Sequence, residues 1–290
     1  MRHTILGAIS FILLLAWTGT AWPQDKKARQ ANPIPTPTKK IIYKKIGDKE
    51  LLLHVFEPAG HKASDQLPAI VLFHGGGWSI GDSSDLYPQC AYLARRGMWA
   101  ASGQYRLKPA DAQRIADCVE DAKAAVRYMR EHAEELGIDP QRIAAGGGSS
   151  GGHIAAGAAL LPETDAKGKP VEAKPDPLGK PNLLVLFNPA LGGNYLNFDY
   201  FTKETPPSIL FYGTKDWMVK LGPECLAQAK KVGFSVEVYT AEGQSHGFFK
   251  LPPWFDRTMY QVDRFLAKNG YLKGDPTIKL PDGTHLEELK

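Results

Sequence analysis

The chain of 290 residues is long enough for one large domain with a substantial core, and its 43% hydrophobic and 23% charged residues are ordinary for a soluble globular protein. Its formal net charge is only +4, from 35 basic and 31 acidic residues. This weak excess, with short lysine clusters only near the N-terminus, argues against a nucleic-acid-binding surface.

The first 21 residues predict a secretory signal peptide. Arg2 gives a positive start, the stretch from Ile5 to Trp17 is mostly apolar, and small residues up to Ala21 offer a cleavage site. An uncleaved anchor is the alternative, but the apolar core is short for a membrane span. We therefore expect export to a periplasm or the exterior, without stable membrane insertion.

Residues 22–40 are rich in Pro, Lys and Gln and predict an extended linker. Two apolar runs then flank Gly47 to Glu50 and predict a hairpin. The continuous apolar run Pro68–Phe73 is typical of a strand that is buried on both faces, and a helical period extends from Ala112 to Leu136. The other expected strands are 98–105, 142–145, 183–187, 208–212 and 235–239, and the other expected helices include 154–161, 226–232 and 254–268.

Strands that alternate with helices after an opening hairpin predict an α/β fold with a mostly parallel central sheet. The expected domain covers residues 41–270, with a surface insertion at 162–181, and residues 271–290 form a polar C-terminal tail. Ligands of such sheets bind at the carboxyl ends of the strands, and every motif below follows an expected strand.

Three cysteines lie beyond the signal segment, at positions 90, 118 and 225. Their number is odd and their spacing fits no metal site, so buried, inert thiols are the expected state. If one disulfide forms, Cys90 with Cys118 is the better pair, because both fall on helices that are expected to be neighbours.

The segment from Gly147 to His153 is a glycine-rich turn between an expected strand and an expected helix. In this context G-x-S-x-G predicts a nucleophile elbow, a strained turn that exposes a serine hydroxyl. Two frames are possible, with either Ser149 or Ser150 as the nucleophile. The strand register favours Ser149, and Ser150 would then donate its backbone N–H to a developing oxyanion.

A second glycine-rich loop, His74 to Trp78, follows the strand that ends at Phe73. Such a loop can supply backbone N–H groups to an oxyanion hole, although by itself it could equally be a turn without a ligand. His74 is expected to shape this loop rather than to titrate, and Asp82 is expected to brace it. His153 is expected to pack near the sheet.

A serine nucleophile needs a histidine base that is held by an acid, and in this fold the chain order is Ser, acid, His. His246 follows an expected strand, whereas His285 lies in the polar tail, so His246 is the base candidate. Asp216 follows the strand 208–212 and is the acid candidate. Weaker acid candidates lie in irregular segments or a turn, at Asp139, Asp176 and Asp199.

Several motifs occur in a fixed order over residues 41–268. They are His74–Trp78 with Gly81-Asp82, Tyr105-Arg106-Leu107, Asp139-Pro140-x-Arg142-Ile143 leading into Gly147–Gly152, Gly213-Thr214-x-Asp216, and Ser245-His246-Gly247-Phe248. On these motifs the chain resembles the α/β-hydrolase superfamily, and within it the hormone-sensitive-lipase-like and the BD-type feruloyl or acetyl xylan esterases. The resemblance implies an α/β-hydrolase fold, with helices on both faces of the sheet.

The resemblance also implies a catalytic triad of Ser149, Asp216 and His246, with Gly76, Gly77 and Ser150 as oxyanion donors. The sequence departs from the lipase-like pattern at Gly148 and at Gly103-Gln104, where Asp is common. Both departures shift weight modestly towards the carbohydrate esterases.

The expected function is therefore that of an exported serine esterase without a metal or organic cofactor. Trp78, Trp217 and Tyr195 are candidates for the substrate pocket, although ordinary packing has comparable weight. Export and the resemblance suggest acetyl or feruloyl groups on a polysaccharide, with a small-molecule ester as the other possibility. The alternatives are a serine peptidase or amidase of the same fold and a hydrolase-fold binding protein without turnover.

Overall fold

The computed structural model describes residues 34–108, 114–162, 177–192, 196–280, 282–283 and 285–290. The expected signal peptide, most of the linker, Tyr195 and Asp176 therefore lie outside the described residues. Residues from Ile34 onwards form one compact unit.

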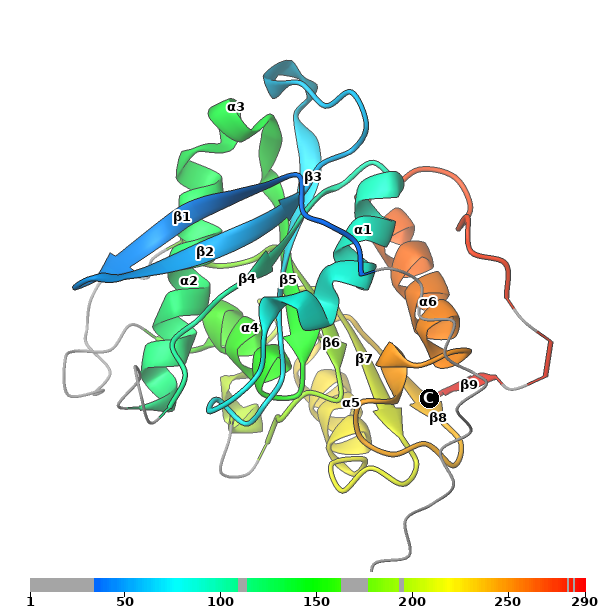
Figure 1. Ribbon diagram of the computed structural model, residues 1–290. Coiled ribbons are helices and arrows are strands. Elements are labelled where there is room, and N and C mark those ends of the chain that lie inside the picture. The colour runs from blue at the N-terminus through cyan, green and yellow to red at the C-terminus, as the bar shows by residue number, and fades with distance from the viewer. Residues whose placement is uncertain (1–33, 109–113, 163–176, 193–195, 281, 284) are drawn as a thin grey trace, which may run out of the picture. The chain divides into compact units, whose positions relative to one another are not determined.

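A nine-stranded sheet runs through the described residues, in the order β1-β2-β4-β3-β5-β6-β7-β8-β9 (Figure 1). The six strands from β4 to β8 in this order are parallel, and β1, β2 and β9 are antiparallel to their neighbours. The expected mostly parallel sheet is thus confirmed. The strands are β1 (Lys39–Ile46), β2 (Lys49–Phe56), β3 (Leu67–Phe73), β4 (Trp99–Gly103), β5 (Ile138–Gly148), β6 (Leu183–Phe187), β7 (Ser208–Gly213), β8 (Val236–Ala241) and β9 (Leu286–Glu288).

Helices cover both faces of this sheet, as expected. The α-helices are α1 (Tyr87–Arg95), α2 (Ile115–Glu131), α3 (Ala133–Leu136), α4 (Ser150–Leu160), α5 (Leu221–Val232) and α6 (Trp254–Lys268). Short 3-10 helices are η1 (Ala63–Asp65), η2 (Ser83–Leu86), η3 (Phe198–Tyr200) and η4 (Phe248–Lys250). None of the helices in the described part of the chain combines the length and the apolar character needed to cross a bilayer.

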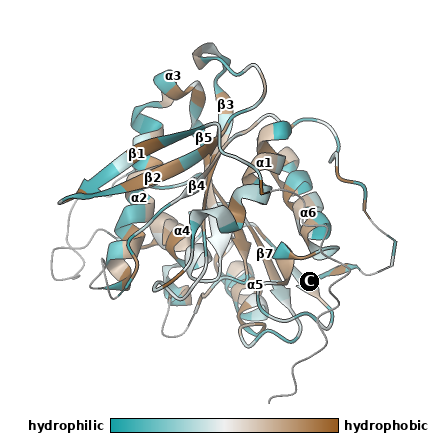
Figure 2. Cartoon of the chain, in the orientation of Figure 1, coloured by the Kyte–Doolittle hydropathy of each residue, from teal (hydrophilic) through white to brown (hydrophobic). Residues whose placement is uncertain are grey.

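Two hydrophobic clusters, one on each face, hold the helices to the sheet. Alternate residues of β3 point to opposite faces, so Val71 and Phe73 join one cluster while Ile70 and Leu72 join the other. The first cluster contains residues of α2, α4 and α5, and the second contains residues of α1 and α6. Figure 2 shows the hydrophobic residues concentrated on the central strands, while α2 and α6 carry both hydrophobic and hydrophilic segments.

The structure excludes the pairing of Cys90 with Cys118, which the sequence had left open. Helices α1 and α2 lie on opposite faces of the sheet, and the two thiols belong to different hydrophobic clusters. All three cysteines are free and buried, and burial raises the pKa of each thiol. They are thus the inert buried thiols that the sequence favoured.

Some element boundaries differ from expectation. The expected helix that ends at Leu136 is interrupted at His132, where α2 ends and the short α3 begins. Strand β5 begins at Ile138 rather than near Arg142, because Ile138 already pairs with Leu67 across a register shift. The C-terminal tail contributes the edge strand β9, which pairs with β8.

Candidate active site

Ser149 lies in the turn between β5 and α4 with φ 53° and ψ −117°, a backbone conformation that non-glycine residues rarely adopt. The glycines around it are required by space. A Cβ at Gly147 or at Gly151 would lie 2.2 or 2.0 Å from the carbonyl oxygen of Phe73. Ser149 therefore occupies the turn itself, and Ser150 is the buried first residue of α4.

The loop that follows β3 lies directly against this turn. A Cβ at Gly75 would lie 3.3 Å from the Cβ of Ser149, and Gly76, Gly77 and Trp78 all have positive φ. A side chain at Gly76 would collide with the carbonyl oxygen of Ile80, since a Cβ there would be only 1.9 Å away. The glycines thus let the backbone itself approach the position above Ser149, as an oxyanion hole requires.

His74, the first residue of this loop, holds it through contacts with Gly75 and Tyr105. Its Nδ1 lies 2.7 Å from the carbonyl oxygen of Gly75, its ring stacks on Tyr105, and the Tyr105 hydroxyl donates to its carbonyl oxygen at 3.0 Å. Burial lowers the pKa of His74, which favours the neutral ring. Asp82 caps η2 by accepting a hydrogen bond from the N–H of Ser84 at 2.8 Å.

Asp216 and His246 come together from the loops after β7 and β8. The Nδ1 of His246 lies 2.9 Å from Oδ2 of Asp216, whose side chain is buried. Burial alone would raise the pKa of Asp216, but hydrogen bonds from His246, the N–H of Met218 and Asn188 outweigh it and hold that pKa below its usual value of 3.8. The carboxylate is therefore ionised and oriented towards the imidazole.

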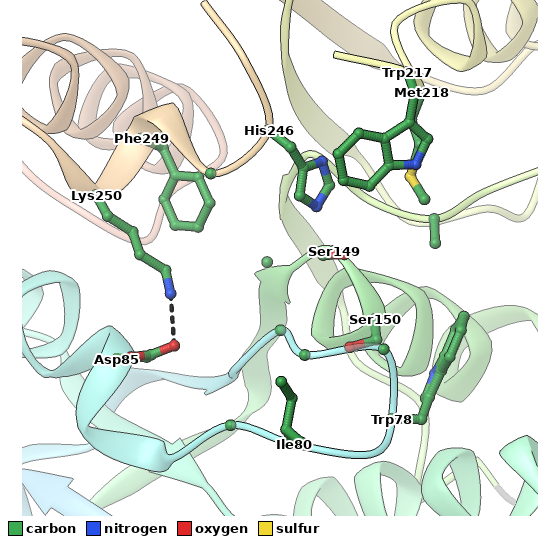
Figure 3. Close-up of a pocket in the computed structure, with 17 residues that line it drawn as sticks. Trp78, Ile80, Asp85, Ser149, Ser150, Trp217, Met218, His246, Phe249 and Lys250 are labelled. Carbon is green, nitrogen blue, oxygen red and sulfur yellow. Dashed lines mark hydrogen bonds and ion pairs between the residues drawn. The ribbon is translucent and has the colours of Figure 1, made fainter. Parts of the chain in front are cut away.

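Ser149 and His246 line one cavity of about 500 Å³ together with Gly76, Gly77 and Ser150 (Figure 3). Figure 3 marks no hydrogen bond between the Ser149 hydroxyl and His246. Such contacts are often long in unliganded enzymes and tighten when substrate binds. Asp216 is not among the residues that line the cavity, and it contacts His246 from outside it.

Two tryptophans line the same cavity. Trp217 stacks on His246 with ring centroids 4.1 Å apart, yet it remains 67% exposed. Trp78 packs edge-on against His153, with centroids 5.1 Å apart, and His153 is buried on α4. The third aromatic candidate, Tyr195, lies outside the described residues.

The weaker candidates for acid and base lie elsewhere. Asp139 forms an ion pair with Arg142 at 2.6 Å, Asp199 belongs to the exposed η3, and His285 is an exposed residue just before β9. None of these three residues lines the cavity around Ser149. Within the part of the chain that the structure describes, no group of three or more His, Cys, Asp or Glu side chains could hold a metal ion.

Comparison with known proteins places this architecture in a family. The BD-FAE family model matches residues 53–178. The structure of Thermogutta terrifontis esterase 2 phosphorylated by paraoxon superposes with a TM-score of 0.76 and 35% sequence identity, over 85% of this chain and 99% of that one. The chain belongs to the α/β-hydrolase esterases. This confirms the fold and the family that the motifs predicted.

Other members of the family are similar over shorter stretches. Carboxylesterase NlhH of Mycobacterium tuberculosis is 39% identical over 109 residues, which are 37% of this chain and 33% of that protein. Carboxylic ester hydrolase LipN of the same species is 39% identical over 103 residues, or 35% of this chain and 26% of that protein. The match thus spans a third or less of the length of these two curated relatives.

One departure from the lipase-like pattern of this family has a structural counterpart. Gly148 occupies the position where Asp is usual, and a Cβ there would lie 2.8 Å from Cζ of Phe249. The Phe249 ring lines the cavity and fills the space that a side chain at position 148 would need. A side chain at position 148 would therefore require the Phe249 ring to move.

Sequence reasoning missed several residues of the site. Ile80, Asp85, Met218, Phe249 and Lys250 line the cavity, and Lys250 forms an ion pair with Asp85 at 2.6 Å (Figure 3). Asn188 follows β6 and contacts both Asp216 and the loop of His246. Its place after a parallel strand was a usable signal, whereas no local motif marked Asp85 or Lys250.

Proposed function

We propose that this protein is an exported serine carboxylesterase with Ser149, His246 and Asp216 as its catalytic triad. The observation that carries the proposal is the placement of Ser149, on a strained turn, in one cavity with a histidine whose far nitrogen is held by a buried carboxylate. The names of the carboxylesterase relatives support the reaction class.

His246 would act first as a base and then as an acid. Its Nε2 takes the proton of the Ser149 hydroxyl while the Oγ attacks the ester carbonyl carbon. Backbone N–H groups of Gly76, Gly77 and Ser150 stabilise the oxyanion, and Asp216 stabilises the imidazolium. The C–O bond to the alcohol then breaks and His246 protonates the leaving oxygen. Water, activated by the same ring, hydrolyses the acyl-serine and restores the enzyme.

The triad is tested by the Ser149→Ala variant. Alanine keeps a Cβ and removes the nucleophile, so we expect an unchanged fold and a loss of p-nitrophenyl acetate hydrolysis by a factor of about 10³ to 10⁶. Circular dichroism monitors the fold, and a fluorophosphonate probe should label only the wild type. Wild-type turnover by the variant, or an unreactive wild-type protein that binds esters without hydrolysis, would refute the proposal.

The proposed substrates are short-chain or aromatic acyl esters, with acetyl or feruloyl groups on polysaccharide as the natural class. The BD-FAE match supports this class, and the structures of Thermogutta terrifontis esterase 2 include propionate-bound and butyrate-bound forms. Nitrophenyl esters from C2 to C16 and a panel of acetylated polysaccharides test it. We expect turnover to fall with acyl length; preference for long chains, or for amides over esters, would contradict this assignment.

Export rests on the sequence of residues 1–21. Expression of the full chain in a bacterial host, followed by fractionation and N-terminal sequencing, tests it. A mature protein that begins near residue 22 outside the cytoplasm is the expected result, whereas retention with the N-terminus intact would contradict export.

A further inference from the structure

Asn188 is buried immediately after β6, at the carboxyl end of a strand that lies between β5 and β7. Its neighbours in the sheet therefore lead to Ser149 on one side and to Asp216 on the other. Its φ is 47°, in the left-handed region that asparagine tolerates better than most residues. A fully buried amide in such a conformation requires partners for both its donor and its acceptor.

The two ends of the Asn188 amide contact two different loops. Nδ2 donates to Oδ2 of Asp216 at 2.7 Å, the same oxygen that lies 2.9 Å from Nδ1 of His246. Oδ1 accepts a hydrogen bond from the N–H of Gly247 at 3.3 Å, next to His246 in the chain. The Asn188 backbone N–H donates to the carbonyl oxygen of Phe211 in β7, which fixes the residue against the strand before Asp216.

We propose that Asn188 is a positioning residue, which holds the Asp216 carboxylate and the His246 loop at the separation that catalysis requires. This inference rests on the proposed esterase function. An apolar residue of similar size would leave the Gly247 N–H without this acceptor and would remove one of three donors to Asp216. Because Asn188 does not line the cavity, its effect would be on the geometry of the triad and not on substrate binding.

The Asn188→Gly variant isolates the side chain. Glycine adopts the same positive φ without strain, so the variant removes the amide and keeps the backbone path. We expect kcat for p-nitrophenyl acetate to fall about 10- to 100-fold, as for small displacements of catalytic groups, with KM changed less than about twofold. The rate of fluorophosphonate labelling of Ser149 should fall in parallel.

Asn182→Gly is the matched control, at the other end of the same strand. Its Oδ1 accepts hydrogen bonds from the N–H of Ile143 at 3.2 Å and from Arg130 at 2.8 Å, far along the strand from the triad loops. This variant loses two hydrogen bonds as well, so it reports the effect of general destabilisation. We expect a lower melting temperature and unchanged kcat.

Asn188→Asp is a second test, which keeps the shape and the acceptor to Gly247. At low pH the introduced carboxyl is protonated and donates to Asp216 as the amide does. As the pH rises the introduced carboxyl loses that proton. The carboxylates at positions 188 and 216 then repel each other, and only one imidazole is present to balance their charge. We expect kcat to fall progressively with rising pH relative to the wild type, an effect that Asn188→Gly should not show.

The outcomes separate the two proposals. A wild type that neither hydrolyses the ester nor reacts with fluorophosphonate refutes the esterase function itself. With an active wild type, loss of kcat in Asn188→Gly but not in Asn182→Gly supports the positioning role. A wild-type kcat in Asn188→Gly, an effect on KM alone, or an Asn188→Asp pH profile that superimposes on the wild type overturns it.

Discussion

Trp217 both contacts His246 and remains exposed to solvent. Its indole covers one face of His246, at a centroid distance of 4.1 Å, while 67% of the side chain remains in contact with solvent. So large an exposed aromatic surface in the cavity of Ser149 is available for stacking on an aromatic acyl group or a sugar ring. Trp217 therefore lines the cavity and covers His246, and a role in binding aromatic substrates is a prediction that can be tested.

Replacement of Trp217 by alanine should act selectively on aromatic substrates. Aromatic stacking contributes about 0.5–1.5 kcal/mol, so we expect kcat/KM for a feruloyl ester to fall about two- to twelvefold. The reference substrate is ethyl acetate, which has no aromatic ring. p-Nitrophenyl acetate is unsuitable because its leaving group is itself aromatic. Trp217→Phe should recover most of the loss. Equal losses on ethyl ferulate and ethyl acetate would show that the indole only supports His246.

At the scale of elements, two short 3-10 helices form one wall of the cavity. Helix η2 follows the glycine-rich loop and carries Asp85, while η4 follows His246 and carries Lys250. Their ion pair, at 2.6 Å, connects the segment after the glycine-rich loop with the segment after His246. Because both side chains are more than a third exposed, the pair is weak and sensitive to salt.

Removal of this ion pair should widen the range of accepted esters. In Asp85→Ala/Lys250→Ala we expect kcat/KM for bulky esters, relative to p-nitrophenyl acetate, to rise about two- to fivefold. An exposed ion pair contributes less than about 1 kcal/mol, which corresponds to a change of at most about fivefold. A bulky-to-small selectivity ratio measured at low and high salt checks this. Lys39→Ala, which breaks the remote pair with Glu57, is the control. An unchanged ratio in the double variant would contradict the role of the wall.

The same scale shows what could be predicted from the sequence. Ser149, Asp216 and His246 each stand in a local pattern of strand, turn and neighbouring glycines, and such patterns depend on adjacent residues alone. Asn188, Asp85 and Lys250 acquire their contacts only when distant loops meet at one edge of the sheet.

The face of the sheet on which a helix packs is a tertiary property too. Whether Cys90 and Cys118 lie close together could therefore not be derived from the helices that carry them. Strand β9 is three residues long and is stabilised by pairing with β8, not by its own apolar pattern.

At the scale of the whole molecule, carboxylates with low pKa values link stability to pH. Burial opposes ionisation of Asp117, Asp139 and Asp216, but hydrogen bonds from Arg114, from Arg142 and from His246 respectively outweigh it, so that the pKa of each is lowered. A carboxyl whose pKa is lower in the folded chain stabilises it above the unfolded pKa, and this contribution is lost as the pH falls through the folded value.

The contribution of these three carboxyl groups to the free energy of unfolding should therefore be constant between about pH 5 and 7. It should decrease as the pH falls below about 4. Urea denaturation at a series of pH values measures this. Asp216→Asn should show a shallower decrease than the wild type, because it lacks one of the three linked groups. Stability that rises on acidification from pH 5 to 3 would show that other groups dominate.

The backbone of Ser149 has a consequence for the thermal stability of the chain. A residue with a Cβ held in this region of conformation costs about 1–3 kcal/mol, whereas glycine would cost only about 0.5–1 kcal/mol of additional chain entropy. A chain with glycine at position 149 should thus melt at a higher temperature than the chain with serine. The proposed nucleophile therefore stands at a position where serine itself lowers the stability of the folded chain.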